Sequence, residues 1–257
     1  MTTELRKIFN TEAFRYDRVR PTYPPQIFDD LASAGVPPPA SVLEIGPGTG
    51  KATVPLAERG YRVVAVELGP ALAEVARANL AAFPGVTVEV ADFEQWPLPE
   101  TGFDVVLAAT AFHWIDPAIR VEKSADALRP GGLLATVTTH HIRGGTLEFF
   151  ARVQEHYERW DPKTDPDQRL RPAAEIPVDD EEIRHRFEAP VFHRYEWEAT
   201  YATGDYLDLL LTYSPTRSLP PEAREGLLTA IGRLIDEQHN GRVVKRYLSE
   251  LRLGRRR

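Results

Sequence analysis

The fold is decided by Val42-Leu43-Glu44-Ile45-Gly46-Pro47-Gly48-Thr49-Gly50-Lys51. An aliphatic run with one acidic residue turns through three glycines into a helical pattern that begins at Lys51-Ala52-Thr53-Val54. Glycine lets the backbone bend tightly and lets a ligand approach main-chain N–H groups without a Cβ in the way. A helix N-terminus after such a turn favours a carboxylate or a phosphate. The stretch therefore predicts a strand, loop and helix that bind a nucleotide-type cofactor.

The spacing of the glycines indicates which cofactor. A dinucleotide fingerprint, G-x-G-x-x-G/A, would place its third small residue at position 51, where this chain has a charged lysine. The third glycine stands one place earlier, at Gly50. Glu44 to Gly50 resembles motif I, [DE]-x-G-x-G-x-G, of the class I S-adenosylmethionine-dependent methyltransferases. The resemblance implies that S-adenosylmethionine is the cofactor and that Glu44, Gly46, Gly48, Thr49 and Gly50 bind it.

The pattern of strands and helices predicts an α/β fold with a doubly wound, Rossmann-like sheet. Its strands are nearly continuous apolar runs, as expected where helices cover both faces of a parallel sheet. The resemblance implies seven strands, with an antiparallel final pair, and helical cap insertions. We expect strands at 41–45, 62–67, 86–90, 103–109, 133–138, 191–200 and 242–251, and helices at 52–59, 71–82, 118–128, 147–160, 205–213 and 222–237.

Three regions are expected along the chain. Residues 1–40, rich in Phe, Tyr, Arg and Pro, are expected to form N-terminal lid helices. Residues 41–140 are expected to form the S-adenosylmethionine-binding core. Residues 141–257 are expected to supply the cap helices and the last antiparallel strands of the same sheet.

Ligands of open α/β sheets bind outside the carboxyl ends of the strands, so the residues there are candidates. Glu67 ends the second strand and is expected to accept the ribose hydroxyls, or else to be a solvated carboxylate. Leu68 is expected to lie on the adenine face. In the resembled family an acidic residue at the position of Asp92 accepts the adenine amino hydrogens, and Phe93 would flank the ring. A cap or loop role is the alternative for Asp92.

The fourth strand ends at Ala109-Thr110-Ala111-Phe112-His113-Trp114. Small residues such as Thr110 leave room there for the methionine arm of the cofactor. The Phe-His-Trp stretch resembles small-molecule methyltransferases of this class. His113 is the candidate general base, because an unperturbed imidazole titrates near neutrality. Alternatively, His113 only hydrogen-bonds the cofactor or orients the substrate.

The segment Tyr16-Asp17-Arg18-Val19-Arg20-Pro21-Thr22-Tyr23-Pro24 resembles a stretch of a subset that includes trans-aconitate-type carboxyl methyltransferases. Arg20 could pair with the cofactor carboxylate as a charge-assisted fork, and aromatic residues such as Tyr16 could exclude water from the site. The alternative is that Arg20 and Tyr23 only pin the lid to the core.

Composition limits the classes of partner. The 257 residues carry a net charge of −7, which gives no reason to expect nucleic acid, and we expect Arg255–Arg257 to be a solvated tail. The chain has no cysteine, no apolar run that could span a membrane and no signal-peptide core, so a cytoplasmic protein is expected. His140 and His141 are adjacent and cannot point the same way on a strand, so we expect no metal. The sequence leaves the oligomeric state open.

The function expected is in-line SN2 transfer of a methyl group to an oxygen or nitrogen of a small molecule. A non-catalytic, S-adenosylmethionine-binding regulatory module is one alternative, and an NAD-dependent oxidoreductase is another. The acceptor pocket should lie within residues 140–240, where arginines accompany a set of aromatic residues, most of them expected to be ordinary core: Phe149, Phe150, Tyr157, Trp160, Trp197, Tyr201 and Tyr213.

Overall fold

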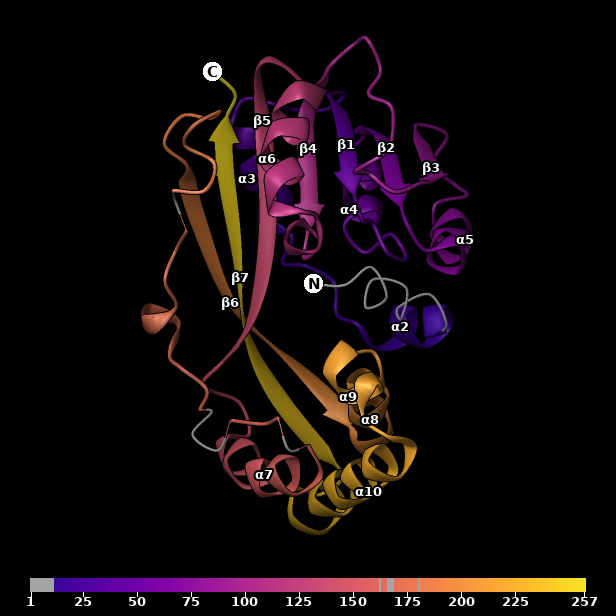
Figure 1. The fold of residues 1–257 in the computed structure, drawn as a ribbon, viewed down its shortest axis with the longest axis vertical. Coiled ribbons are helices and arrows are strands. Elements are labelled where there is room, and N and C mark those ends of the chain that lie inside the picture. The colour runs from indigo at the N-terminus through magenta and orange to yellow at the C-terminus, as the bar shows by residue number, and fades with distance from the viewer. Residues whose placement is uncertain (1–11, 162, 166–168, 180) are drawn as a thin grey trace.

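The computed structural model describes residues 12–161, 163–165, 169–179 and 181–257 (Figure 1). Residues 1–11 of the predicted lid lie outside the described residues. Within the described ranges, one seven-stranded sheet has the order β3-β2-β1-β4-β5-β7-β6, and only β7 runs antiparallel to its neighbours. The predicted α/β fold and antiparallel final pair are confirmed. The strands are β1 (Ser41–Ile45), β2 (Arg62–Glu67), β3 (Val86–Val90), β4 (Phe103–Ala109), β5 (Leu128–Ile142), β6 (Val191–Ala202) and β7 (Arg242–Arg255).

Helices cover both faces of the parallel part of the sheet (Figure 1). Side chains of α3 (Gln26–Ser33) belong to one apolar cluster, and those of α6 (Pro117–Ala127) belong to another. Because the two clusters take alternate residues of β1 and β4, they lie on opposite faces of the sheet. The remaining core helices are α4 (Thr53–Glu58), α5 (Pro70–Asn79) and the short 3-10 helix η2 (Phe112–Trp114).

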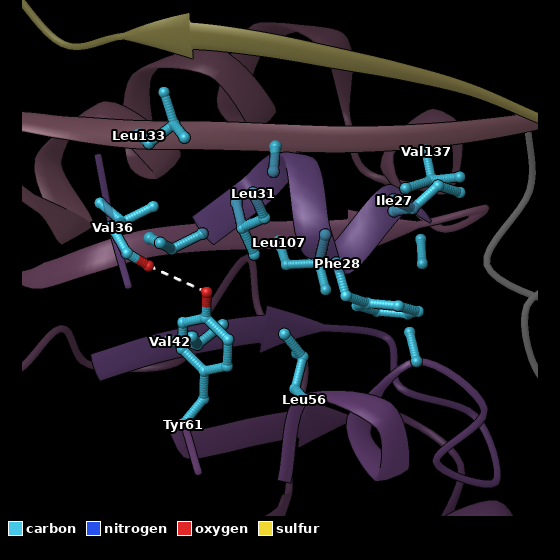
Figure 2. Close-up of a cluster of buried hydrophobic side chains, with 14 of the residues drawn as sticks. Ile27, Phe28, Leu31, Val36, Val42, Leu56, Tyr61, Leu107, Leu133 and Val137 are labelled. Atoms are coloured by element: carbon cyan, nitrogen blue, oxygen red, sulfur yellow. Dashed lines mark hydrogen bonds between the residues drawn. The ribbon is translucent and has the colours of Figure 1, made fainter. Parts of the chain in front are cut away.

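The first cluster joins α3 to the sheet (Figure 2). Phe28 and Leu31 of α3 pack among buried strand residues that include Val42 and Leu107. The hydroxyl of Tyr61 donates a hydrogen bond of 2.9 Å to the carbonyl of Val36, which satisfies a polar group inside this apolar region. The second half of the predicted lid segment therefore packs on the core, while the predicted division into three regions stays a prediction.

The fifth strand is longer than predicted. It runs from Leu128 to Ile142, and its register against β4 shifts between Phe103 and Val105, where Arg129–Gly132 bulge out. Beyond position 138 it continues because β7 pairs with it as far as Ile142. Pairing with a strand from the far end of the chain is not visible in the local sequence, so the expected range of 133–138 was too short.

The cap is built on the far ends of β5, β6 and β7, which extend past the parallel core (Figure 1). A third apolar cluster lies in the cap. It contains Phe149 and Tyr206 of the cap helices, Val243 and Tyr247 of β7, and Val19. One strand, β7, therefore belongs to both the core and the cap. The elements of the cap side are α2 (Ala13–Val19), α7 (Leu147–Trp160), η3 (Ala173–Glu175), α8 (Thr203–Leu211), α9 (Ser214–Ser218) and α10 (Pro221–Gln238).

Arg255 and Arg256 are half-buried, so the expectation of a solvated tail was wrong for these two residues, while Arg257 is exposed. Arg255 ends β7, and its guanidinium donates to the carbonyls of Gly131 at 2.7 Å and Ala34 at 2.6 Å. The backbone N–H of Arg256 donates to the carbonyl of Gly132 at 2.8 Å. The bonds to Gly131 and Gly132 satisfy carbonyls in the bulge of β5, and the bond to Ala34 satisfies a carbonyl at the end of α3.

The packing of α3 gives a stability prediction. Phe28 is 1% exposed and Phe14 of α2 is 80% exposed. Phe28→Ala is expected to lower the free energy of unfolding by about 3–5 kcal/mol, because it removes buried contacts and leaves a cavity. The control Phe14→Ala should change it by less than about 0.5 kcal/mol. Urea denaturation measures both, and a loss below about 1 kcal/mol for Phe28→Ala would contradict the packing of α3 in the core.

Candidate functional site

The glycine loop after β1 adopts a backbone that favours glycine. Gly46, Gly48 and Gly50 have φ angles of +65°, +60° and +90°, in the left-handed region that side chains rarely adopt. A Cβ on Gly46 would also lie 2.8 Å from the Cβ of Ala111. The loop therefore passes close under the end of β4, as a cofactor loop at this edge of the sheet requires.

Glu67, at the carboxyl end of β2, fixes this loop from the neighbouring strand. Its Oε2 accepts the N–H of Gly48 at 2.9 Å, and its Oε1 accepts the N–H of Gly69 at 2.8 Å. Burial raises the pKa of Glu67, while these backbone hydrogen bonds lower it. The carboxylate is therefore not a solvated strand end, and with three backbone donors, which include the N–H of Leu68, it keeps capacity for a further donor.

Glu44, the acidic residue of the glycine motif, is 1% exposed. Among the described residues its Oε2 has no hydrogen-bond partner. Burial raises the pKa of Glu44 to about 7, and the nearby charge of Glu67 acts in the same direction. A hydrogen bond from the side chain of Thr53 opposes this rise without cancelling it, and the unpartnered Oε2 can accept a further donor.

One cavity of about 1590 Å³ opens at this edge of the sheet and extends into the cap. Thr49 and Gly50 do not line it. Thr49 is fully buried, and its carbonyl accepts the side-chain amide of Asn79 at 2.9 Å, so it supports the loop from behind. The predicted residues that do line the cavity are Tyr16, Arg20, Glu44, Gly46, Gly48, Glu67, Leu68, Asp92, Phe93, Thr110 and His113.

Asp92 and Phe93 follow β3 at the rim of the cavity. One oxygen of Asp92 accepts the N–H of Glu94 at 3.0 Å, which is the loop role that stood as an alternative. The second oxygen of the same carboxylate keeps its acceptor capacity. Phe93 is buried in the cluster that carries α6, and the ammonium of Lys123 lies 5.3 Å from its ring centroid.

Thr110 is held in a left-handed conformation, with φ +53°, where β4 meets the cavity. Its N–H donates to the carbonyl of Val137 at 2.7 Å, and its hydroxyl lies 2.8 Å from the hydroxyl of Tyr23. Backbone strain of this kind persists only where surrounding contacts enforce it, and it is common at functional sites. Tyr23 also donates to the carbonyl of Ala109 at 3.2 Å, so it pins the N-terminal segment to the core.

Arg20 also pins this segment. Its Nε donates to the hydroxyl of Thr212 at 2.8 Å, and its Nη2 donates to the Thr212 carbonyl at 2.9 Å. The guanidinium carbon lies 5.1 Å from the ring centroid of Tyr16 and 4.4 Å from that of Tyr213. Arg20 therefore bridges α2 and the end of α8 inside the cavity, and its use by a cofactor carboxylate stays a prediction.

His113 lines the cavity from η2 and keeps much of its surface exposed. Partial desolvation lowers the pKa of His113, and the positive charge of Arg120 lowers it further. The imidazole is therefore neutral at physiological pH and has a nitrogen that can accept a proton.

The cap half of the cavity contains residues that the sequence did not single out, above all Lys245 and Tyr247 of β7. Burial and the charge of Lys245 lower the pKa of His141 to about 2, so that ring is neutral. Of the aromatic set expected near the acceptor, Phe149, Trp160 and Tyr201 do not line the cavity. Those that line it are Phe150, Tyr157, Trp197 and Tyr213.

Neither a candidate metal cluster nor a candidate membrane helix occurs among the described residues. No group of three or more His, Cys, Asp or Glu side chains in this part of the chain could hold a metal ion. No helix in it is both long and apolar enough to cross a membrane.

The sequence is similar to known methyltransferases. Residues 43–136 match the family model of a methyltransferase domain. An uncharacterized methyltransferase of Mycobacterium tuberculosis is 42% identical over 129 residues, which are 50% of this chain and 51% of that protein. A demethylmenaquinone methyltransferase of Tropheryma whipplei is 27% identical over 160 residues, which are 58% of this chain and 64% of that protein. The match thus spans about half the length of the mycobacterial relative.

Solved structures share the fold. A protein of Anaeromyxobacter dehalogenans described as a candidate type II methyltransferase superposes with a TM-score of 0.60 and 24% identity, over 92% of this chain and 97% of that one. A Haemonchus contortus phosphoethanolamine N-methyltransferase, solved with phosphomonomethylethanolamine and S-adenosylhomocysteine, gives 0.55 and 17%, over 99% of this chain and 60% of that one. At these identities the likeness establishes the fold.

The raised pKa of Glu44 predicts a pH-dependent stability. The folded chain holds a proton up to about pH 7, whereas the unfolded chain releases it near the ordinary value of 4.5. The stability that this group contributes is therefore complete below pH 4.5 and is lost as the pH rises to about 7. At about 1.4 kcal/mol per pKa unit, ionisation of the buried carboxyl at pH 8 costs about 3 kcal/mol.

Glu44→Gln, which mimics the protonated form, should raise the unfolding free energy of the cofactor-free protein by about 3 kcal/mol at pH 8 and by about 1 kcal/mol at pH 5. Urea denaturation at both values measures the difference, with the exposed Glu74→Gln on α5 as the control for charge removal. An equal gain at both pH values would contradict a raised pKa at Glu44.

Proposed function

We propose, from the premise that residues 43–136 form a methyltransferase domain with the class I fold, that this protein transfers the methyl group of S-adenosylmethionine to a small molecule. The acceptor atom is an oxygen or a nitrogen. One observation carries the proposal: a single cavity joins the glycine loop and Glu67 to the aromatic and cationic side chains of the cap. A donor and an acceptor can therefore occupy the same cavity.

The residues at the sheet edge fit S-adenosylmethionine. Gly46 and Gly48 leave the backbone open to the cavity, and Glu67 has acceptor capacity for ribose hydroxyls. The unpartnered oxygen of Glu44 can accept a hydrogen bond from the cationic end of the cofactor. The second oxygen of Asp92 is available to the adenine amino group, and Leu68 lines the cavity beside it.

The chain itself contributes orientation, closure and a proton acceptor. When bound, the cofactor supplies a methyl group that is already activated on a sulfonium. The protein then has to hold the acceptor in line, which accounts for about 7–11 kcal/mol of a barrier in well-oriented reactions. Tyr16 and Arg20 exclude water from one side. His113, neutral at physiological pH, takes the proton that a hydroxyl or amine acceptor releases.

Two similar proteins support the small-molecule acceptor and the cofactor in this proposal. The relative from Tropheryma whipplei is named for a small-molecule acceptor, demethylmenaquinone. The Haemonchus contortus enzyme, which has the same fold, was solved with S-adenosylhomocysteine, the demethylated form of the cofactor. A cytoplasmic location and the absence of a nucleic-acid partner remain predictions from the sequence.

Calorimetric titration tests the cofactor. We expect S-adenosylmethionine and S-adenosylhomocysteine to bind and NAD not to bind. NAD binding without S-adenosylmethionine binding would favour the oxidoreductase. Transfer of a labelled methyl group to a broad panel of hydroxyl, amine and carboxylate acceptors then tests catalysis. Cofactor binding without labelling of any acceptor would favour the regulatory module.

Glu67→Gln tests the ribose contact. The change keeps the size of the side chain but removes the charge and one acceptor, so S-adenosylhomocysteine should bind about 10- to 100-fold more weakly. Titration of the wild type and the variant measures this. Glu74→Gln, on the exposed face of α5, is the matched control and should leave the affinity unchanged. Equal affinities of wild type and Glu67→Gln would exclude the contact.

His113→Ala tests the proton acceptor. With a hydroxyl or amine acceptor identified by labelling, the variant should transfer methyl groups about 10²- to 10⁴-fold more slowly. The affinity for S-adenosylhomocysteine should be unchanged, which separates proton transfer from cofactor binding. An unchanged rate would remove His113 from the mechanism, and a loss that follows cofactor affinity alone would make it a binding residue.

A further inference from the structure

Lys245, in the middle of β7, is a buried lysine that faces the cavity. It is 5% exposed, and its ammonium lies 5.3 Å from the ring centroid of Tyr247, 5.4 Å from that of Tyr213 and 6.0 Å from that of Tyr206. Its nearest hydrogen-bonding group is the hydroxyl of Tyr213, at 3.4 Å. Within the described residues no carboxylate forms an ion pair with this ammonium.

A buried ammonium without a counter-charge is costly. The penalty for removing such an ion from water is several kcal/mol, and the three ring contacts at 5.3–6.0 Å, near the outer limit for a cation–π contact, supply neither a counter-charge nor a hydrogen bond. Cation–π contacts are worth about 0.5–2 kcal/mol each. Lysine is almost never fully buried unless it is paired, so the position of Lys245 calls for an anion in the space that it faces.

The charge of Lys245 lowers the pKa of a neighbouring tyrosine. Burial raises the pKa of Tyr213, but the charges of Lys245 and Arg20 together hold it below its usual value. Tyr213 lies between the two cations, since the Arg20 guanidinium is 4.4 Å from its ring centroid. Its hydroxyl can donate to an anion bound at Lys245.

The rest of this part of the cavity suits an aromatic body. Trp197 stacks on Tyr247 with ring centroids 4.6 Å apart, and Phe150 packs edge-on against His141 at 4.5 Å. His141 is neutral, and its Nε2 is buried without a hydrogen-bond partner among the described residues. The cation therefore lies among aromatic rings and one neutral imidazole.

We propose that Lys245 and the hydroxyl of Tyr213 bind a carboxylate on an aromatic methyl acceptor and so anchor the acceptor in the cavity. That the bound molecule is the acceptor rests on the proposed function, whereas the anion site itself does not. One ammonium balances the single charge of a carboxylate, while a phosphate monoester carries about −1.5 to −2 at neutral pH. The ammonium also occupies lone pairs of the carboxylate. The role of the carboxylate is therefore to orient the acceptor.

Benzoate and benzamide, which have the same shape and differ in charge, test the site by calorimetric titration of the full chain. A charge-assisted hydrogen bond is worth about 1.5–3 kcal/mol, so benzoate should bind at least about 10-fold more tightly than benzamide. In Lys245→Met the two affinities should agree within about twofold. The control Arg152→Met removes one positive charge from the exposed face of α7 and should keep the full preference.

A second variant covers the case in which Lys245→Met does not fold. Tyr213→Phe leaves the charge in place and removes one donor, so it should reduce the preference by about 2- to 12-fold. Thermal unfolding gives a further readout: benzoate should raise the unfolding temperature of the wild type, and benzamide should not.

Three results would overturn the proposal. They are equal binding of benzoate and benzamide by the wild type, a preference that survives in folded Lys245→Met, and binding of phenyl phosphate more than 10-fold tighter than that of benzoate. S-adenosylhomocysteine is titrated separately. Its failure to bind would overturn the proposed function while the benzoate result still decides the anion site.

Discussion

The ladder of backbone hydrogen bonds that places β7 between β5 and β6 is the constraint on which the molecule depends. The ladder runs from Val191 opposite Leu253, in the core, to Ala202 opposite Arg242, in the cap. On the other side, β7 pairs with β5 from Leu133 to Ile142. Because one strand carries both halves, the cap cannot change position without breaking or bending this ladder.

The same ladder decides which side chains face the cavity. Side chains alternate along a strand, and directly opposed residues of an antiparallel pair lie on one face. Tyr247 is opposite His141 on one side and Trp197 on the other, and Lys245 lies two residues away. A shift of one residue in the register would turn this whole set to the other face. The chemistry of the cap half of the cavity is thus a consequence of register.

Much of the core could be predicted from the sequence because its signals are local. The glycine loop, Glu67 and Asp92 stand at strand ends, and strand ends follow from short apolar runs. Lys245 could not be predicted, because its surroundings come from distant parts of the chain: Tyr206 and Tyr213 lie on or next to α8, and β7 is reached only after α10. The strand at 242–251 was expected, but its apolar residues are too scattered to indicate which face is buried.

The length of β5 and the contacts of the terminal arginines could not be predicted either, because they too depend on distant parts of the chain. A Pro-Gly-Gly run normally ends an element, and here it forms a bulge whose carbonyls are satisfied by Arg255 and by the backbone of Arg256. Bulges of this kind bend a strand and leave groups unpaired, so they need partners from elsewhere. The local sequence predicts the turn but does not indicate which residues satisfy its carbonyls.

The two ends of the cavity differ in charge, and Arg20 lies between them. Glu44 and Glu67 are buried beside the glycine loop, whereas Lys245 is buried under the cap. Tyr16 would lie 3.6 Å from a Cβ on Gly48, and the Arg20 guanidinium is 5.1 Å from the Tyr16 ring and 4.4 Å from the Tyr213 ring. A cation is thus favoured at one end and an anion at the other. Tyr16 at the loop end and Tyr213 at the cap end both contact the guanidinium of Arg20, so one side chain touches residues at both ends of the cavity.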